Sequence, residues 1–128
     1  MYTILIVDDE RPAQTFLKAI CQKYCPAFDT ILLSGSADDA LRLMAQQHVH
    51  VLVTDISMPG INGIELAQRV RQLYPRTHTV IVSGYAEFEF ARGAIQAGVD
   101  DYLLKPVEIQ SFRQILDRIR ETLDAEAN

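Results

Sequence analysis

Short apolar runs recur along the chain at intervals of about 20 to 30 residues, which is the length of a strand, a helix and two loops. Several of these runs are continuous and β-branched rather than alternating with polar residues. That pattern is typical of parallel strands that are covered on both faces. The spacing therefore predicts five strands, at residues 4–7, 31–33, 51–53, 80–82 and 102–104.

Between the runs the apolar period changes to that of a helix, and several helices have recognisable ends. Pro12 stands near the first turn of one helix, where its missing N–H costs nothing. Ser36, with Asp39 three residues later, predicts the start of a second. A third is expected to begin near Asn62 and to end at Pro75.

A fourth helix is expected at 87–98 and a fifth after the last strand. The chain then reads as strand and helix five times over, in one domain that spans 1–128. Right-handed crossovers require a doubly wound, five-stranded parallel sheet of the α/β class. The apolar residues expected to face the sheet are Phe16, Leu17, Ile20 and Tyr24 in the first helix and Ile109, Phe112, Ile115, Ile119 and Leu123 in the last.

Composition narrows the possible functions. The 128 residues are 48% hydrophobic with a formal charge of −5, so the segment by itself repels nucleic acid. The longest aliphatic run, 4–7, is far shorter than a membrane span, and no signal peptide is recognisable, so a cytoplasmic location is the default expectation. Cys21 and Cys25 are expected to be free, partly buried thiols.

Polar residues follow four of the five predicted strands. Because the carboxyl ends of parallel strands meet at one edge of the sheet, these side chains are expected to converge there. Carboxylates placed together repel each other, and bound Mg²⁺ relieves that repulsion, while a lysine beside them suits a phosphoryl oxygen. The residues are Asp8, Asp9 and Glu10 after the first strand, Asp55 after the third, Ser83 and Gly84 after the fourth, and Lys105 and Pro106 after the fifth.

Asp55 is the candidate nucleophile, because an aspartate in such a setting can form an acyl phosphate. Taken singly, these residues have ordinary structural interpretations: Asp8 or Asp9 as a helix N-cap, and Lys105 as a solvated surface residue. Their common position at the edge where such folds carry their sites favours the functional interpretation. His48, His50 and His78 show no ligand-like spacing and are assigned no role.

Four motifs occur in order along nearly the whole chain: ILIVDDE at 4–10, DISMP at 55–59 followed by Gly63, Glu65 and Leu66, VSGY at 82–85, and GVDDYLLKP at 98–106. Together they resemble the receiver domain of bacterial two-component response regulators. The resemblance implies a flavodoxin-like fold with strand order 2-1-3-4-5. It also implies a signalling domain that catalyses only its own phosphorylation and dephosphorylation.

The resemblance further implies a phosphoacceptor and its metal. Asp55 would take a phosphoryl group from the phosphohistidine of a sensor histidine kinase. Asp9 and Asp55 would ligate Mg²⁺ directly, the backbone carbonyl of Ser57 would be a third ligand, and Asp8 would help through water.

Other roles follow from the same family. Lys105 would pair with a phosphoryl oxygen, and its peptide bond to Pro106 would be cis. Ser83 would be the switch hydroxyl, and Tyr102 the aromatic partner that turns inward, although a half-buried strand aromatic is a compatible interpretation. The output surface would be the face made by the fourth helix, the fifth strand and the fifth helix, with dimerisation there on phosphorylation.

Ser57 and Tyr85 flank the site and would tune the phosphoryl lifetime. The stretch 83–91, which includes Gly84 and Tyr85, is similar to receivers fused to AraC-type DNA-binding domains. The chain is accordingly expected to be the N-terminal part of a transcription regulator that contacts DNA only through an output domain. A stand-alone receiver that acts by protein docking is the alternative.

Two other classes fit less well. A phosphatase of the haloacid dehalogenase type also uses a nucleophilic aspartate, Mg²⁺ and lysine, but it needs a second acid two residues after the nucleophile, where this chain has Ser57. It also normally carries a cap domain, for which 128 residues leave no room. A flavodoxin-like electron carrier needs a hydroxyl-rich phosphate loop, and an acidic loop at 8–10 would repel the flavin phosphate. No glycine-rich nucleotide loop is present.

Overall fold

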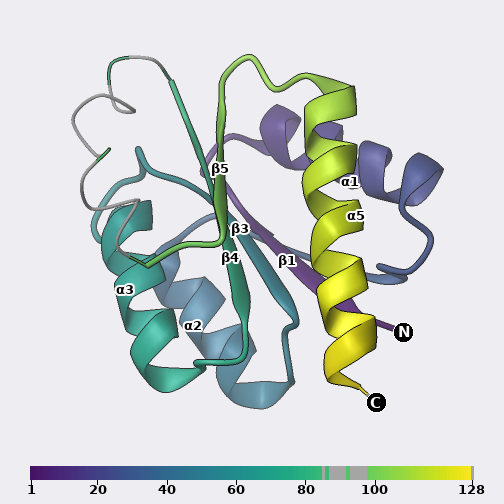
Figure 1. Cartoon of the computed structure of the whole chain (residues 1–128). Coiled ribbons are helices and arrows are strands. Elements are labelled where there is room, and N and C mark those ends of the chain that lie inside the picture. Colours follow the sequence, from purple (N-terminus) through teal and green to yellow (C-terminus); the bar gives the residue numbers. More distant parts are fainter. Residues whose placement is uncertain (85, 87–91, 93–97, 128) are drawn as a thin grey trace.

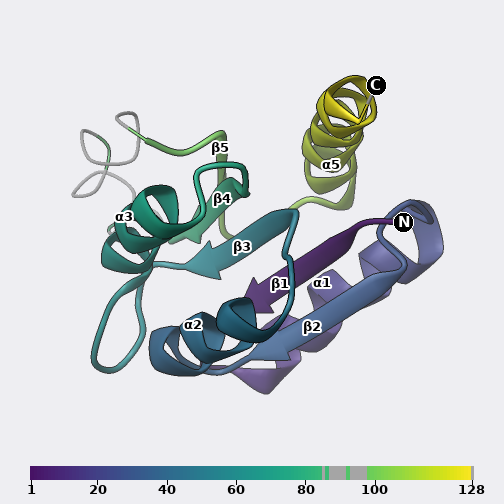
Figure 2. The same cartoon turned by 90° about the horizontal axis from the view of Figure 1, so that it is seen from below.

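The computed structural model describes residues 1–84, 86, 92 and 98–127. Five parallel strands form one sheet in the order β2-β1-β3-β4-β5, so the doubly wound sheet and its strand order are confirmed. Figure 1 shows the sheet between its helices, and the strand labels in Figure 2 follow this order. Tyr85 and nearly all of the fourth helix expected at 87–98 lie outside the described residues. The strands are β1 (Thr3–Val7), β2 (Thr30–Ser34), β3 (Val51–Asp55), β4 (His78–Ser83) and β5 (Asp101–Leu104), and the helices are α1 (Arg11–Tyr24), α2 (Ala37–Gln46), α3 (Gly63–Leu73) and α5 (Ile109–Glu126).

The helices begin where the sequence predicts. Ser36 caps α2 by accepting the backbone N–H of Asp39 at 3.1 Å. Asn62 caps α3 in the same way, accepting the N–H of Glu65 at 2.9 Å. The N-cap position of α1 is Glu10, which makes no side-chain capping bond, and Pro12 lies in the first turn. The aspartates that precede α1 are therefore not its caps.

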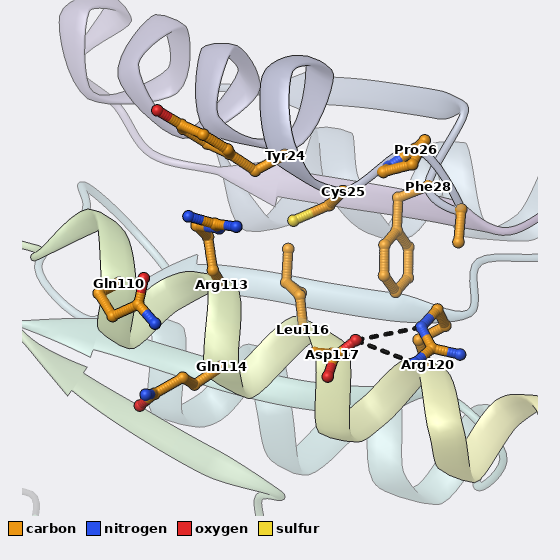
Figure 3. Close-up of a pocket in the computed structure, with 11 residues that line it drawn as sticks. Tyr24, Cys25, Pro26, Phe28, Gln110, Arg113, Gln114, Leu116, Asp117 and Arg120 are labelled. Carbon is orange, nitrogen blue, oxygen red and sulfur yellow. Dashed lines mark hydrogen bonds and ion pairs between the residues drawn. The ribbon is translucent and has the colours of Figure 1, made fainter.

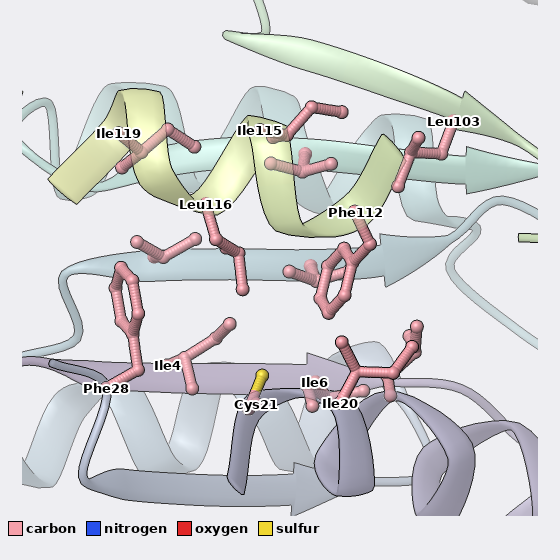
Figure 4. Packing of buried hydrophobic residues seen from close by; sticks show 14 of the residues in the cluster. Ile4, Ile6, Ile20, Cys21, Phe28, Leu103, Phe112, Ile115, Leu116 and Ile119 are labelled. Carbon is pink, nitrogen blue, oxygen red and sulfur yellow. The ribbon is translucent and has the colours of Figure 1, made fainter. Parts of the chain in front are cut away.

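Among the described helices, α1 and α5 cover one face of the sheet, and α2 and α3 cover the other (Figures 1 and 2). Side chains alternate along β1, so that Ile4 and Ile6 pack beneath α1 and α5 whereas Leu5 and Val7 pack beneath α2 and α3. Figure 4 shows the first of these clusters, in which Phe112 of α5 lies against the sheet. Each fully buried aliphatic or aromatic side chain stabilises the fold by roughly 1.5–3 kcal/mol. The two clusters together hold the strand ends in fixed positions.

Two residues that the helical pattern predicts to face the sheet are instead exposed. Phe16 is 43% exposed and Ile109 is 42% exposed, so both predictions are wrong. Leu17 points at the sheet, and Phe16 precedes it by one residue, about 100° around the helix axis. Ile109 is the first residue of α5, where the helix has only begun to cover the sheet. Phe16 lines an apolar hollow beside the carboxyl end of the sheet together with Pro12, Ala13, Pro106 and Val107.

The end of α1 packs against α5. Figure 3 shows the pocket between them, where the guanidinium of Arg113 lies 4.1 Å from the ring centroid of Tyr24. Cys25 is half-buried in this pocket and Cys21 is fully buried behind it, and both thiols are free, as the sequence predicted. Burial raises the pKa of Cys21 to about 12, which keeps its thiol protonated. None of the helices in the described part of the chain is long and apolar enough to cross a membrane.

His78, at the start of β4, is held between two carboxylates from distant parts of the chain. Its Nδ1 lies 3.0 Å from Asp100, and its Nε2 lies 3.1 Å from Glu126 at the end of α5. The other oxygen of Asp100 accepts the backbone N–H of Thr79 at 2.7 Å. The hydrogen bond to Asp100, reinforced by Glu126, raises the pKa of His78 from 6.5 to about 9 against the opposing effect of burial. A protonated His78 therefore ties the last turn of α5 to the sheet.

We expect this stabilisation to be lost as the pH rises. An unfolded chain releases the His78 proton near pH 6.5, whereas the folded chain keeps it up to about pH 9. The contribution is therefore fully present below about pH 6.5 and gone above about pH 9. Because the side chains of Asp100 and Glu126 are 39% and 53% exposed, solvent screening limits it to about 1 kcal/mol.

Urea unfolding of the wild type and His78→Gln across this pH range measures the contribution, since other titrating groups cancel in the difference. His48→Gln, which changes an exposed histidine, is the matched control. A wild-type advantage over His78→Gln that stays constant with pH would contradict the assignment.

Candidate functional site

The candidate site begins where β1 and β3 end side by side. Val7 pairs with Thr54 in the sheet, so the next residues, Asp8 and Asp55, leave neighbouring strands together. β1 is also the strand from which the chain winds outward to β2 on one side and, after returning, to β3 on the other. This reversal of winding is the usual place for a site in an open parallel sheet. Asp8 and Asp55 are both buried, at 3% and 7% exposure.

Lys105 brings a positive charge to this pair from the far end of the sequence. It follows β5, and its backbone N–H donates to the carbonyl of Ser83 at 2.7 Å, which fixes the segment against β4. Its Nζ donates to Asp55 at 3.1 Å and to Asp8 at 3.4 Å. The peptide bond between Lys105 and Pro106 is cis, as the resemblance implies.

The charges shift the protonation of these groups. Burial raises the pKa of Asp55 above its ordinary value, with the negative charge of Asp8 adding to the effect, although the bond from Lys105 opposes it. Burial alone would lower the pKa of Lys105, but the hydrogen bonds and charges of Asp55 and Asp8 together raise it. Lys105 is therefore a firmly protonated ammonium held beside two carboxylates.

Asp9 completes a cluster of three carboxylates. Oxygens of Asp8, Asp9 and Asp55 all lie within 4.8 Å of one another, and Asp9 is the exposed member. One oxygen of Asp8 accepts the backbone N–H of Glu10 at 2.9 Å and the other accepts from Lys105. Three carboxylates beside one ammonium leave negative charge that a hard cation would neutralise through oxygen ligands. The donor set therefore fits Mg²⁺, which the sequence predicts here.

Ser83 lies in β4, the strand next to Asp55, and Tyr102 lies in β5, one strand further out. Ser83 ends β4 and is fully buried, and its Oγ has no hydrogen-bond partner among the described residues. A buried hydroxyl without a partner is uncommon, and one at a strand end beside the site can serve an incoming group. Gly84 follows it at a half-buried position. Tyr102 is half-buried and packs against a small cluster beside β4, which agrees with the strand-aromatic interpretation.

The loop after Asp55 is closed by tight backbone contacts. Ser57 is exposed in this loop, and Gly60 adopts a φ of 77°, a conformation that glycine allows. Gly63, the first residue of α3, lies directly against the end of β3, so that a Cβ built on it would lie 1.9 Å from the carbonyl oxygen of Asp55. The N–H of Gly63 donates to the carbonyl of Ile56 at 3.0 Å. Only glycine allows α3 to begin so close to the candidate nucleophile.

Two contributors to this geometry were missed by the sequence analysis. Gly63 was recognised only as part of a motif, although its place after the cap residue Asn62 was a usable signal. Gln14 of α1 was not singled out at all. Its side-chain amide donates to the backbone carbonyls of Asp8 and Ser34, and no sequence pattern marks such a contact in advance.

Comparison with known proteins identifies the family. The model of the response regulator receiver domain matches residues 4–117, which include every residue of the site. The chain belongs to the response regulator receiver domain family. Receiver domains are signalling domains that interact with histidine kinases and generally bind Mg²⁺, and the acidic cluster of this receiver domain could hold that ion.

Relatives of this receiver domain are transcription regulators. It is 37% identical over 123 residues to the transcriptional regulatory protein HptR of Staphylococcus aureus, covering 96% of this chain and 48% of HptR. It is 33% identical over 119 residues to the uncharacterised transcriptional regulatory protein YesN of Bacillus subtilis, covering 93% of this chain and 32% of YesN. The receiver domain thus spans about a third of the length of YesN and about half of the length of HptR.

Solved structures agree with the fold. The receiver domain of AraT, a response regulator from Geobacillus stearothermophilus, superposes with a TM-score of 0.88 at 31% identity, covering 99% of this chain and 98% of that one. A two-component transcriptional regulator AraC from Clostridium phytofermentans superposes with a TM-score of 0.87 at 30% identity and complete coverage of both chains. The flavodoxin-like receiver fold is therefore confirmed.

Proposed function

We propose that this receiver domain accepts a phosphoryl group on Asp55 from the phosphohistidine of a sensor histidine kinase and so switches an output. One observation carries the proposal. The buried carboxylate of Asp55 lies 3.1 Å from the ammonium of Lys105 and belongs to one cluster with Asp8 and Asp9. An acyl acceptor, a mobile positive charge and metal-ligand oxygens are the groups that phosphoryl transfer requires.

In the transfer step an oxygen of Asp55 attacks phosphorus. The new P–O bond forms as the P–N bond to the kinase imidazole breaks, and the electron pair of that bond leaves with the imidazole nitrogen, which takes a proton from solvent. The ammonium of Lys105 then donates to an oxygen of the bound phosphoryl group in place of the Asp55 oxygen, because the lysine side chain is long and flexible. In this proposal the domain catalyses only its own phosphorylation and dephosphorylation.

Four groups would hold Mg²⁺ beside the phosphoacceptor: Asp9 and Asp55 directly, the carbonyl of Ser57, and Asp8 through water. The bound ion supplies charge neutralisation at the phosphoryl oxygens. Asp8 suits a water-mediated role because both of its oxygens already accept hydrogen bonds, from Glu10 and Lys105.

Ser83 and Tyr102 would change position in response to phosphorylation of Asp55. The buried Oγ of Ser83 gains a partner by donating to a phosphoryl oxygen, and the change in its position leaves space for the half-buried ring of Tyr102. The dianionic phosphoryl group thereby shifts the equilibrium between two arrangements of Ser83 and Tyr102. The surface that changes would include β5 and α5, together with the expected helix at 87–98, which lies largely outside the described residues.

The output we propose is transcription. HptR and YesN are named as transcriptional regulators, and the chain covers less than half of either. Residues 1–128 would then be the N-terminal receiver of a longer cytoplasmic regulator that contacts DNA through a separate domain. The solved AraC-type neighbour supports an AraC-type output.

Incubation with acetyl phosphate and Mg²⁺, followed by intact mass measurement, tests the proposed chemistry and its metal. We expect one phosphoryl adduct per chain that hydroxylamine removes, as it does an acyl phosphate, and we expect excess chelator to prevent its formation. A folded wild-type chain that gains no adduct and also fails to bind beryllofluoride would overturn the proposal. Adduct formation that is equally efficient in chelator would overturn the metal assignment alone.

A further inference from the structure

Gln14 lies on α1, outside the set of charged groups at the site, and its side chain reaches back to the sheet. Its Nε2 donates to the carbonyl of Asp8 at 2.6 Å and to the carbonyl of Ser34 at 3.1 Å. An amide nitrogen carries two hydrogens, so a single Nε2 can make both bonds. Asp8 directly follows β1 and Ser34 ends the neighbouring strand β2, so Gln14 joins the two strands at the edge where the site lies.

The bond to Asp8 acts on the peptide unit between the two acidic residues. The carbonyl of Asp8 and the N–H of Asp9 belong to one planar group, so a fixed carbonyl direction fixes the direction in which the chain enters Asp9. Asp9 is the exposed member of the carboxylate cluster. A rotation of this peptide plane would move the Cα of Asp9 and, with it, the carboxylate.

The other groups of Asp8 are already held from different directions. Its N–H donates to the carbonyl of Ser34 at 3.0 Å, and its carboxylate accepts from the N–H of Glu10 and from Lys105. The carbonyl of Asp8 is the remaining polar group, and Gln14 supplies its donor. A partner of this kind, which orients a ligand without touching the metal, commonly changes metal affinity by 10–100-fold when it is removed.

We propose that Gln14 is a positioning residue for the Mg²⁺ site: by holding the peptide plane between Asp8 and Asp9 against the end of β2, it orients both carboxylates toward Asp55. The inference rests on the proposed function, because it assigns Asp9 and Asp55 as metal ligands. It adds that α1, through one neutral side chain, sets how tightly the site holds its cation.

Two substitutions separate the hydrogen bonds from the shape of the side chain. Gln14→Met keeps the length of the side chain and removes the donor. Gln14→Glu keeps the shape but places an acceptor, and at neutral pH a charge, against two carbonyl oxygens. The matched control is Gln22→Met, the same change at an exposed position of the same helix.

The readout is the dissociation constant for Mg²⁺, measured by titration of the unphosphorylated protein and followed by backbone amide chemical shifts. We expect Gln14→Met to weaken Mg²⁺ binding about tenfold and Gln14→Glu to change it at least as much, with Gln22→Met equal to the wild type. Urea unfolding of each variant reports any loss of stability separately, since a merely structural role would lower stability without moving the dissociation constant.

The outcomes distinguish this inference from the function on which it rests. If the wild type binds Mg²⁺ and takes up a phosphoryl group while folded Gln14→Met binds Mg²⁺ with unchanged affinity, the positioning role is wrong and the proposed function stands. If the folded wild type binds no Mg²⁺, both fail. If Gln14→Met does not fold, Gln14→Glu provides the test. An unchanged affinity of Gln14→Glu for Mg²⁺ would then show that the positioning role is wrong.

Discussion

Asp55→Asn is expected to abolish phosphoryl incorporation from acetyl phosphate. The substitution keeps the shape of the side chain but replaces the nucleophilic carboxylate oxygen with an amide, which cannot form an acyl phosphate. The buried neighbour Asp8 is not expected to take over, because both of its oxygens already accept hydrogen bonds. Intact mass measurement on wild type and variant, under identical Mg²⁺ and acetyl phosphate concentrations, gives the result directly.

The fold should survive this change. Burial and the charge of Asp8 raise the pKa of Asp55, so its ionised form is disfavoured in the folded chain and a neutral asparagine removes that cost. We therefore expect Asp55→Asn to unfold at no lower urea concentration than the wild type. Asp29→Asn, the same change at an exposed acid, is the matched control and should phosphorylate normally. An adduct on folded Asp55→Asn would show that another residue is the phosphoacceptor.

Gly63→Ala is expected to have the largest effect on stability. The added Cβ would lie 1.9 Å from the carbonyl oxygen of Asp55 and 2.9 Å from the Cα of Ile56, both backbone atoms that cannot rotate away. Either the start of α3 or the end of β3 must move. Overpacking of this kind costs about 3 kcal/mol, and we expect a loss of that size in the free energy of unfolding measured with urea.

The same substitution elsewhere provides the comparison. Nothing lies within 4 Å of a Cβ built on Gly35, so Gly35→Ala should leave stability nearly unchanged. Because the clash in Gly63→Ala displaces the residue that carries the nucleophile, we also expect that variant to phosphorylate more slowly than Gly35→Ala at temperatures where both are folded. Equal unfolding free energies for the two variants would mean that the approach of α3 to Asp55 is not tight.

The elements of the fold could be predicted because their signals are local. Buried parallel strands have to be apolar along their whole length, and the cap residues Ser36 and Asn62 stand where the helices begin. Phe16 was wrongly placed because it lies about 100° around the axis of α1 from the buried Leu17, and Ile109 because it is the first residue of α5, where the helix has only begun to cover the sheet.

Some residues of the candidate site could likewise be predicted from the sequence, and others could not. The convergence of Asp8, Asp55 and Lys105 follows from topology, since parallel strands end at a common edge. Gln14 could not be recognised because its partners are backbone carbonyls, which every residue carries. His78 was assigned no role because Asp100 and Glu126, at separations of 22 and 48 positions, become its neighbours only in three dimensions.

The wide separation of the site residues along the sequence determines when, during synthesis and folding, the complete site can form. Lys105 lies 97 positions from Asp8 and 50 from Asp55, and it follows the last strand added to the edge of the sheet. A nascent or truncated chain without β5 contains all three aspartates but lacks the ammonium. Such a chain would be a poor phosphoryl acceptor. If Asp55 accepts the phosphoryl group as we propose, a chain therefore becomes competent for phosphorylation only once its sheet is complete.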